Sequence, residues 1–66
     1  MVLTPQQRRQ RNRQDVIDTI LQTARDIMRE QGVAALTLNE IARRMKMRPP
    51  SLYEYFPNKM AIYDRL

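Results

Sequence analysis

The chain has 66 residues and a formal net charge of +5, and it contains neither cysteine nor histidine. A chain of this length forms one small domain. Without cysteine it can build neither a disulfide nor a thiolate metal site, and without histidine it lacks the usual general base and the commonest metal ligand. Its single glycine also rules out a glycine-rich phosphate loop. The composition therefore argues against an enzyme, and no cofactor or metal is expected.

The charge is unevenly distributed along the chain. Residues 1–14 carry four arginines and no acidic residue, residues 15–36 have a net charge of −2, and residues 37–66 have a net charge of +3. Two basic zones that flank an acidic segment favour a polyanionic partner. No apolar run approaches the roughly 18 residues needed to cross a bilayer, and no secretory signal is evident. We therefore expect a cytoplasmic protein without a membrane partner.

The clearest predicted element is a helix that ends just before Gly32. Apolar residues recur in it at the spacing of one helical face, and glycine is a suitable residue to follow its last turn. The members of this face are Val16, Ile17, Ile20, Leu21, Ala24, Ile27 and Met28.

The segment before this face leaves two interpretations open. Thr4 and Pro5 have the pattern of an N-cap followed by a first helical residue, but residues 6–15 offer no apolar face. Residues 1–13 are therefore either a frayed helical extension or a mobile basic arm, and we expect firm helix only from about Asn12. The arginines of this segment are either solvated or bind phosphates or the minor groove. They are Arg8, Arg9, Arg11 and Arg13.

A second, shorter helix is predicted after a linker at residues 33–36. Thr37 and Glu40 form a capping-box pattern, in which the Thr37 hydroxyl accepts a hydrogen bond from the Glu40 backbone N–H and the Glu40 side chain reaches back. Apolar residues at helical spacing continue this helix for about two turns. They are Leu38, Ile41, Ala42 and Met45.

A third helix is predicted after a three-residue break at residues 46–48. Pro49 and Pro50 fit only the first turn of a helix, where their missing N–H groups are not needed, and Pro57 ends the helix. Its predicted core-facing residues are Leu52, Phe56 and, in part, Tyr53. Its predicted outward residues are Ser51, Glu54 and Tyr55.

A fourth helix is predicted to begin after Asn58, which is a good N-cap. Ile62 and Leu66 would lie on one side of it. Because this helix stops in mid-period, we expect the sequence to be the N-terminal piece of a longer protein.

Two short helices that are joined by a tight break and lie on a longer helix form the tri-helical helix-turn-helix layout. We therefore predict an all-α, homeodomain-like bundle at residues 14–57, followed by the start of a fourth helix at residues 58–66. In this layout the second short helix projects from the domain and fits the major groove of DNA, which is about 12 Å wide. Residues 37–56 are the part expected to enter that groove.

The sequence of residues 32–62 closely resembles the DNA-binding domain of the tetracycline-repressor (TetR) family of transcriptional regulators. The shared features are T-x-x-E-I-A at residues 37–42, S-L-Y-x-Y-F at residues 51–56 and P-N-K at residues 57–59. The first helix also fits, so the resemblance extends over roughly residues 14–66. Each piece alone is weak, but the combination is specific.

The resemblance implies a set of DNA-contacting residues. Thr37 caps the second helix and can hold a phosphate, Asn39 contacts a base or a phosphate, and Lys59 binds a phosphate. The recognition helix contributes its front and two aromatic positions, one of which lies against the sugar–phosphate backbone. These recognition-helix residues are Pro49, Pro50, Ser51, Tyr53 and Tyr55.

Two positions depart from the A-G-V-S turn that is common in the family. Lys46 stands in place of the usual glycine, and a non-glycine residue in the left-handed conformation costs about 1–2 kcal/mol. Arg48 replaces the usual small N-cap, so the third helix is expected to begin less tightly, and its side chain can reach a phosphate instead. The basic residues 43, 44, 46 and 48 either form an ordinary exposed face or include at least one phosphate contact.

Two further features leave alternatives open. Glu54 either accepts a hydrogen bond from a cytosine amino group or is simply solvated. Pro49 and Pro50 need no function at a helix start, although their rings can touch a thymine methyl group.

The leading prediction is a sequence-specific DNA-binding transcriptional regulator, in particular a ligand-responsive repressor that binds double-stranded DNA at a palindromic operator. By resemblance, a C-terminal domain absent from this sequence would form a homodimer and bind a small-molecule effector. The alternative is a basic helical module that binds a protein or a membrane surface. Against the membrane version, the polar face of the first helix is acidic, whereas surface-seeking helices carry Lys and Arg there.

Overall fold

The computed structural model describes the backbone of residues 5–66 and the side chains of residues 12–66. This part of the chain is all-helical, which confirms the predicted fold class. Its elements are α1 at Pro5–Gln31, the 3-10 turn η1 at Val33–Ala35, α2 at Leu38–Arg44, α3 at Pro49–Tyr55 and α4 at Lys59–Tyr63. The turn η1 occupies the predicted linker.

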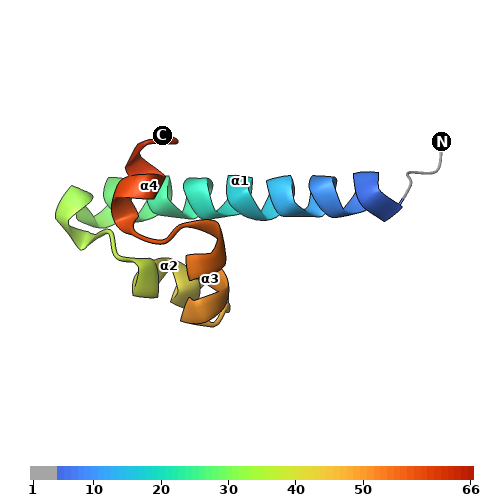
Figure 1. Cartoon of the computed structure of the whole chain (residues 1–66). Coiled ribbons are helices and arrows are strands. Elements are labelled where there is room, and N and C mark those ends of the chain that lie inside the picture. The colour runs from blue at the N-terminus through green and yellow to red at the C-terminus, as the bar shows by residue number, and fades with distance from the viewer. Residues whose placement is uncertain (1–4) are drawn as a thin grey trace.

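Helix α1 is much longer than the others and sets the 42 Å long axis of the molecule. Its C-terminal half lies above α2 and α3 and behind α4 in Figure 1, whereas its N-terminal half extends beyond all three. Among the residues whose side chains are described, Val16 is the first hydrophobic residue of α1 that packs against the core. The part of α1 before it projects past the other helices (Figure 1), and its described side chains add no hydrophobic residue to the core.

The start of α1 differs from the expectation of firm helix only from about Asn12, because the helix begins at Pro5. An extension without an apolar face gains nothing from packing, but adding residues to an existing helix is far easier than starting one. Arginine and glutamine, which dominate this segment, are also good helix formers. Of the two interpretations, residues 5–13 thus take the helical one. The N-cap expected at Thr4 lies outside the described residues.

The core is a single cluster formed by one side of α1 and the inner sides of the following elements. Its buried members are Ile20, Leu21, Ala24, Ile27, Leu36, Ile41, Ala42, Leu52, Phe56 and Ile62. No polar or charged side chain is buried in the part of the chain whose side chains are described. Leu66, expected beside Ile62, is 43% exposed, because α4 ends at Tyr63 and the helical period does not continue.

Gly32 ends α1 as predicted. Its φ of 91° lies in the region that favours glycine, and its N–H donates to the Met28 carbonyl at 2.8 Å. The chain then passes through η1 to Leu36, which is fully buried. This connection sets the position at which α2 starts beneath α1.

Candidate nucleic-acid interface

The N-terminus of α2 is capped by Thr37. Its hydroxyl accepts a hydrogen bond from the Glu40 backbone N–H at 3.0 Å, as predicted. The returning half of the predicted capping box is not formed, because the Glu40 carboxylate accepts from Arg43 and Arg44 instead. A hydrogen bond between a carboxylate and a guanidinium is stronger than one to a neutral amide, and the box pattern takes no account of such competitors.

Glu40 is the centre of a charge network between α1 and α2. Arg43 donates two hydrogen bonds to its carboxylate, at 2.9 Å and 2.6 Å. Arg44 pairs with Glu40 and also with Glu30 of α1, whose carboxylate lies 2.8 Å from the Arg44 guanidinium. The hydrogen bond from Arg43, assisted by Arg44, lowers the pKa of Glu40 to about 2. Glu40 and Glu30 respectively raise the pKa of Arg43 and of Arg44. Both arginines are therefore already partnered, and Arg44 ties two helices together.

The network gives a defined pH dependence of stability. Because the folded-state pKa of Glu40 lies below its ordinary value of 4.5, the stabilisation is fully present above that value and is lost as the pH falls toward about 2. We expect Glu40→Gln to lower the thermal midpoint at neutral pH, and the difference to shrink through this window. Glu54→Gln is the control, since Glu54 has no ion pair among the described residues. A midpoint difference that stays constant in acid would contradict the assignment.

The turn between α2 and α3 is closed by Lys46 in the left-handed conformation, with φ of 55°. The Lys46 N–H donates to the Arg43 carbonyl at 3.2 Å, and the Met47 N–H donates to the Ala42 carbonyl at 2.9 Å. These paired bonds form a Schellman motif, which satisfies the last free carbonyls of a helix. The strain predicted from the missing glycine is therefore built into this turn.

Lys46→Gly is expected to stabilise the domain by about 1 kcal/mol, because glycine adopts this conformation without a Cβ clash. The free energy of unfolding in urea measures the change. Lys46→Ala removes the same charge but keeps the Cβ atom, so we expect it to stay within about 0.5 kcal/mol of the unaltered chain. Equal stabilisation by both variants would assign the effect to charge rather than to the backbone.

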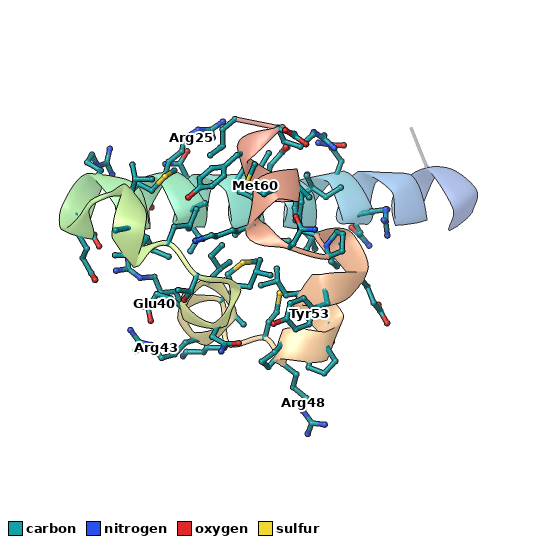
Figure 2. The ribbon with its side chains drawn as sticks, turned by 60° about the vertical axis from the view of Figure 1, so that its left-hand side comes forward. Arg25, Glu40, Arg43, Arg48, Tyr53 and Met60 are labelled. Carbon is teal, nitrogen blue, oxygen red and sulfur yellow. The ribbon has the colours of Figure 1, made fainter. Side chains whose placement is uncertain are left out.

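Helix α3 begins without a capping side chain. Arg48 is the N-cap residue and makes no side-chain hydrogen bond to the first turn, as predicted, and Pro49 and Pro50 follow it. The Arg48 side chain extends away from the body of the molecule (Figure 2) and has no ion pair among the described residues. It is therefore an exposed cation at the tip of α3.

One side of α3 faces the core. Leu52 and Phe56 are buried, as predicted, but the two tyrosines exchange their predicted places. Tyr55 is half-buried against the core, whereas Tyr53 is 45% exposed. Tyr55 stands three residues after Leu52 and therefore shares its side of the helix, while Tyr53 is turned about 100° away from Leu52. The remaining residues of α3 are exposed: Pro49, Pro50, Ser51 and Glu54.

The N-terminal half of α1 contacts α3 through Arg13. The Arg13 guanidinium lies over the Tyr55 ring, 4.9 Å from its centre, which is within the range of a cation–π interaction. Arg13 is thus held beside α3. The side chains of Arg8, Arg9 and Arg11 lie outside the described residues, and only their helical backbone is placed.

A shallow hollow of about 380 Å³ lies between the start of α2, one side of α3 and the start of α4. Four of its lining residues are in the predicted DNA-contacting set: Thr37, Asn39, Tyr53 and Lys59. Three others were not: Leu38, Pro57 and Asn58. The P-N-K motif at residues 57–59 was the sequence signal that could have identified Pro57 and Asn58. The Asn58 side chain accepts a hydrogen bond from the Ala61 N–H at 3.0 Å, so it caps α4 as predicted.

The surface around the hollow and α3 is basic. Lys46, Arg48 and Lys59 are exposed, and none of them has an ion pair within residues 12–66. The described residues contain no group of acidic side chains placed to hold a metal ion. None of the helices described is long and apolar enough to cross a membrane. Chemically, this arrangement suits binding to an extended anion.

The chain matches the model of the family described as bacterial regulatory proteins, tetR family, over residues 20–66. It is 39% identical over 49 residues to the tetracycline repressor protein class A from transposon 1721 of Escherichia coli. It is 35% identical over 48 residues to the class G protein of Vibrio anguillarum, and 34% identical over 55 residues to the class D protein of Escherichia coli.

These alignments cover 74%, 73% and 83% of this chain but only 23% of each relative. The chain therefore spans less than a quarter of the length of the curated relatives it matches. No solved structure matches the chain significantly. The family model covers well over half of the chain, including all of α2, α3 and α4, and the chain belongs to the tetR family of bacterial regulatory proteins.

Proposed function

We propose that this chain is the DNA-binding part of a transcriptional regulator and that α3 enters the major groove. The observation that carries the proposal is the two-sided α3, which is anchored through buried Leu52 and Phe56 while its other side is open to solvent. A helix with its side chains is about 10–12 Å across, and the major groove is about 12 Å wide. The relatives named above are repressors, which supports a regulatory role.

Residues around α3 would hold the domain in register on the sugar–phosphate backbone. We propose that the hollow binds a short stretch of the sugar–phosphate backbone. Lys59 would supply positive charge there, and Asn39 and Tyr53 would supply polar groups. The Thr37 hydroxyl accepts from Glu40 and still has its own proton to donate to a phosphate oxygen. Arg48 contributes a second exposed cation at the opposite end of α3.

The N-terminal half of α1 is proposed to contact phosphates and not minor-groove bases. A helix about 10–12 Å across cannot enter a minor groove about 6 Å wide. Because residues 5–13 are helical, contact with the phosphates of the DNA backbone is the role that we propose for Arg8, Arg9 and Arg11. Arg13 supports this placement, because its contact with Tyr55 holds α1 beside the helix that would lie in the groove.

Joint replacement of Arg8, Arg9 and Arg11 by glutamine is expected to weaken binding to all DNA sequences about equally. It should also reduce the log–log salt slope by about two to three, while glutamine keeps the helix propensity. Dissociation constants for an operator and an unrelated duplex, measured over a salt series, give both quantities. Arg25→Gln is the control, since Figure 2 shows Arg25 on the opposite side of the molecule from Arg48. Altered discrimination between sequences without a change in slope would contradict phosphate contact.

We further propose a cytoplasmic homodimer on a palindromic operator, controlled by a small-molecule effector that binds outside this domain. The match to only 23% of each relative supports the presence of further parts in a complete regulator. A single module of this size buries too little surface to bind DNA tightly, so a second copy on a second half-site would raise the affinity greatly. Control by an effector rests on the relatives named as tetracycline repressors.

Selection of bound duplexes from a random DNA pool by the full-length protein tests this proposal. We expect the recovered sequences to share a palindrome, with half-sites about one helical turn of 34–36 Å apart or a multiple of it. A pool without enrichment would count against sequence-specific regulation.

The membrane-surface alternative is not favoured by the charges of α1. From Asp15 on, its exposed residues include three acidic side chains, Asp15, Asp18 and Glu30, beside only two basic ones, Arg25 and Arg29. An interfacial helix would carry an excess of basic residues toward anionic lipid. Sedimentation with anionic vesicles separates the two functions. We expect the protein to stay in the supernatant at a salt concentration at which it binds DNA.

A further inference from the structure

The outward side of α3 carries an unusual pair of residues. Pro50 and Glu54 are four residues apart, so they lie one above the other along the helix, and both are exposed. Each is two residues from Leu52, which is fully buried, and each is therefore turned about 160–200° away from the core. When α3 lies in the major groove, this ridge of Pro50 and Glu54 is its deepest part.

The first turn of α3 offers no backbone donor to DNA. Pro49 and Pro50 have no N–H group. The N–H groups of Ser51 and Leu52 donate to the Arg48 carbonyl at 3.0 Å and 3.3 Å. The tip instead presents two exposed proline rings, and an apolar group in the major groove meets one apolar base feature, the C5-methyl group of thymine.

Glu54 has a narrow choice of partners in a DNA groove. Its carboxylate only accepts hydrogen bonds, it is repelled by phosphates, and it has no ion pair among the described residues. Cytosine presents an N4 amino donor in the major groove. The amino donor of adenine lies beside the N7 acceptor, which repels a carboxylate. Cytosine is therefore the base that suits Glu54.

We propose that Pro50 and Glu54 determine the base specificity of this protein, Pro50 by packing on a thymine methyl group and Glu54 by accepting from the N4 amino group of a cytosine. Four residues correspond to about 6 Å along the helix, or about two base-pair steps of 3.4 Å. Each half-site thus contains a thymine and a cytosine within about two base pairs of each other, on either strand. The assignment rests on the proposed function, in which α3 occupies the major groove.

Deoxyuridine tests the role of Pro50, because it differs from thymidine only by the methyl group. The operator recovered by selection is resynthesised with each thymine of a half-site replaced in turn. We expect one replacement to weaken binding of the full chain about fourfold, and Pro50→Ala to remove that difference. For each variant, the affinity for the thymine duplex is compared with the affinity for the deoxyuridine duplex. A change in the folding stability of the variant affects both affinities equally and therefore cancels. Met60→Ala, which truncates an exposed apolar residue on α4, should keep the fourfold difference.

Glu54→Gln tests the carboxylate at nearly constant shape. We expect the preference for cytosine at one half-site position to fall about tenfold, while binding to unrelated DNA becomes tighter because a negative charge near the phosphates is removed. Asp64→Asn removes an exposed acid beyond α4 and should change neither quantity.

The outcomes separate this assignment from the proposed function. A recovered palindrome that binds equally well with deoxyuridine at every thymine, or an unchanged base preference in Glu54→Gln, would overturn the assignment and leave the proposed function standing. A selection that enriches no sequence would overturn both. A single uridine-sensitive thymine within about two base pairs of a Glu54-dependent cytosine is the result expected.

Discussion

Phe56→Ala is expected to destabilise the domain by about 3–5 kcal/mol. Phe56 is 3% exposed and belongs to the single core cluster, and its N–H donates to the Leu52 carbonyl where α3 ends. A chain of 66 residues has a total stability of about 3–10 kcal/mol on the usual per-residue scale. The loss is therefore comparable to the whole stability, and we expect a largely unfolded variant.

Tyr53→Ala is the matched control for Phe56→Ala. It truncates an aromatic residue on the same helix, but this residue is 45% exposed, so we expect a loss below about 1 kcal/mol. Urea unfolding followed by helical circular dichroism gives both values. Similar losses in the two variants would mean that α3 is not anchored in the core through Phe56.

The affinity for DNA is expected to fall steeply with salt. If one domain contacts about four to six phosphates, the log–log slope is about −4 to −5, and affinity falls about 250- to 1,000-fold between roughly 50 and 200 mM salt. The exposed cations Lys46, Arg48 and Lys59 and the basic start of α1 supply enough positive charge for this number. A flat salt response would exclude phosphate contact as the main source of affinity.

Lys59→Ala identifies one of these contacts. We expect it to reduce the slope by about one and to weaken binding about uniformly across sequences, because a phosphate contact carries no base information. Arg29→Ala removes the same charge near the C-terminal end of α1, where Arg29 pairs with Asp26 at 2.8 Å, and should leave the slope unchanged. Equal effects of the two variants would indicate a response to net charge alone.

The sequence was sufficient to predict features with a local physical cause. The caps at Thr37 and Asn58 follow from side chains that can accept from the amide three residues on, and the prolines of α3 fit only a first turn. The left-handed turn at Lys46 followed from the family pattern at that position. Such features depend on a few neighbouring residues, so they could be recognised before the packing was known.

Features that depend on packing were harder to predict. Tyr53 and Tyr55 were exchanged because they lie on the two sides of Leu52, about 100° and about 60° from it around the helix, and the contacts of α1 decide which one turns inward. The choice of Glu40 between an amide and two arginines depends on where α2 places those side chains. The early start at Pro5 was missed since a helix without a buried face leaves no apolar period to detect.

The placement of α3 in the major groove can be tested directly by cross-linking, because this chain contains no cysteine. Ser51→Cys puts a thiol on the exposed side of α3, and Asp18→Cys puts one on the exposed side of α1. Operator duplexes carry a disulfide-activated tether either on a pyrimidine C5, in the major groove, or on a guanine N2, in the minor groove. We predict that Ser51→Cys forms a bond with the major-groove tether alone and that Asp18→Cys forms none. Two results would contradict the recognition role of α3. One is a bond between Ser51→Cys and the minor-groove tether. The other is a bond between Asp18→Cys and either tether while Ser51→Cys forms none.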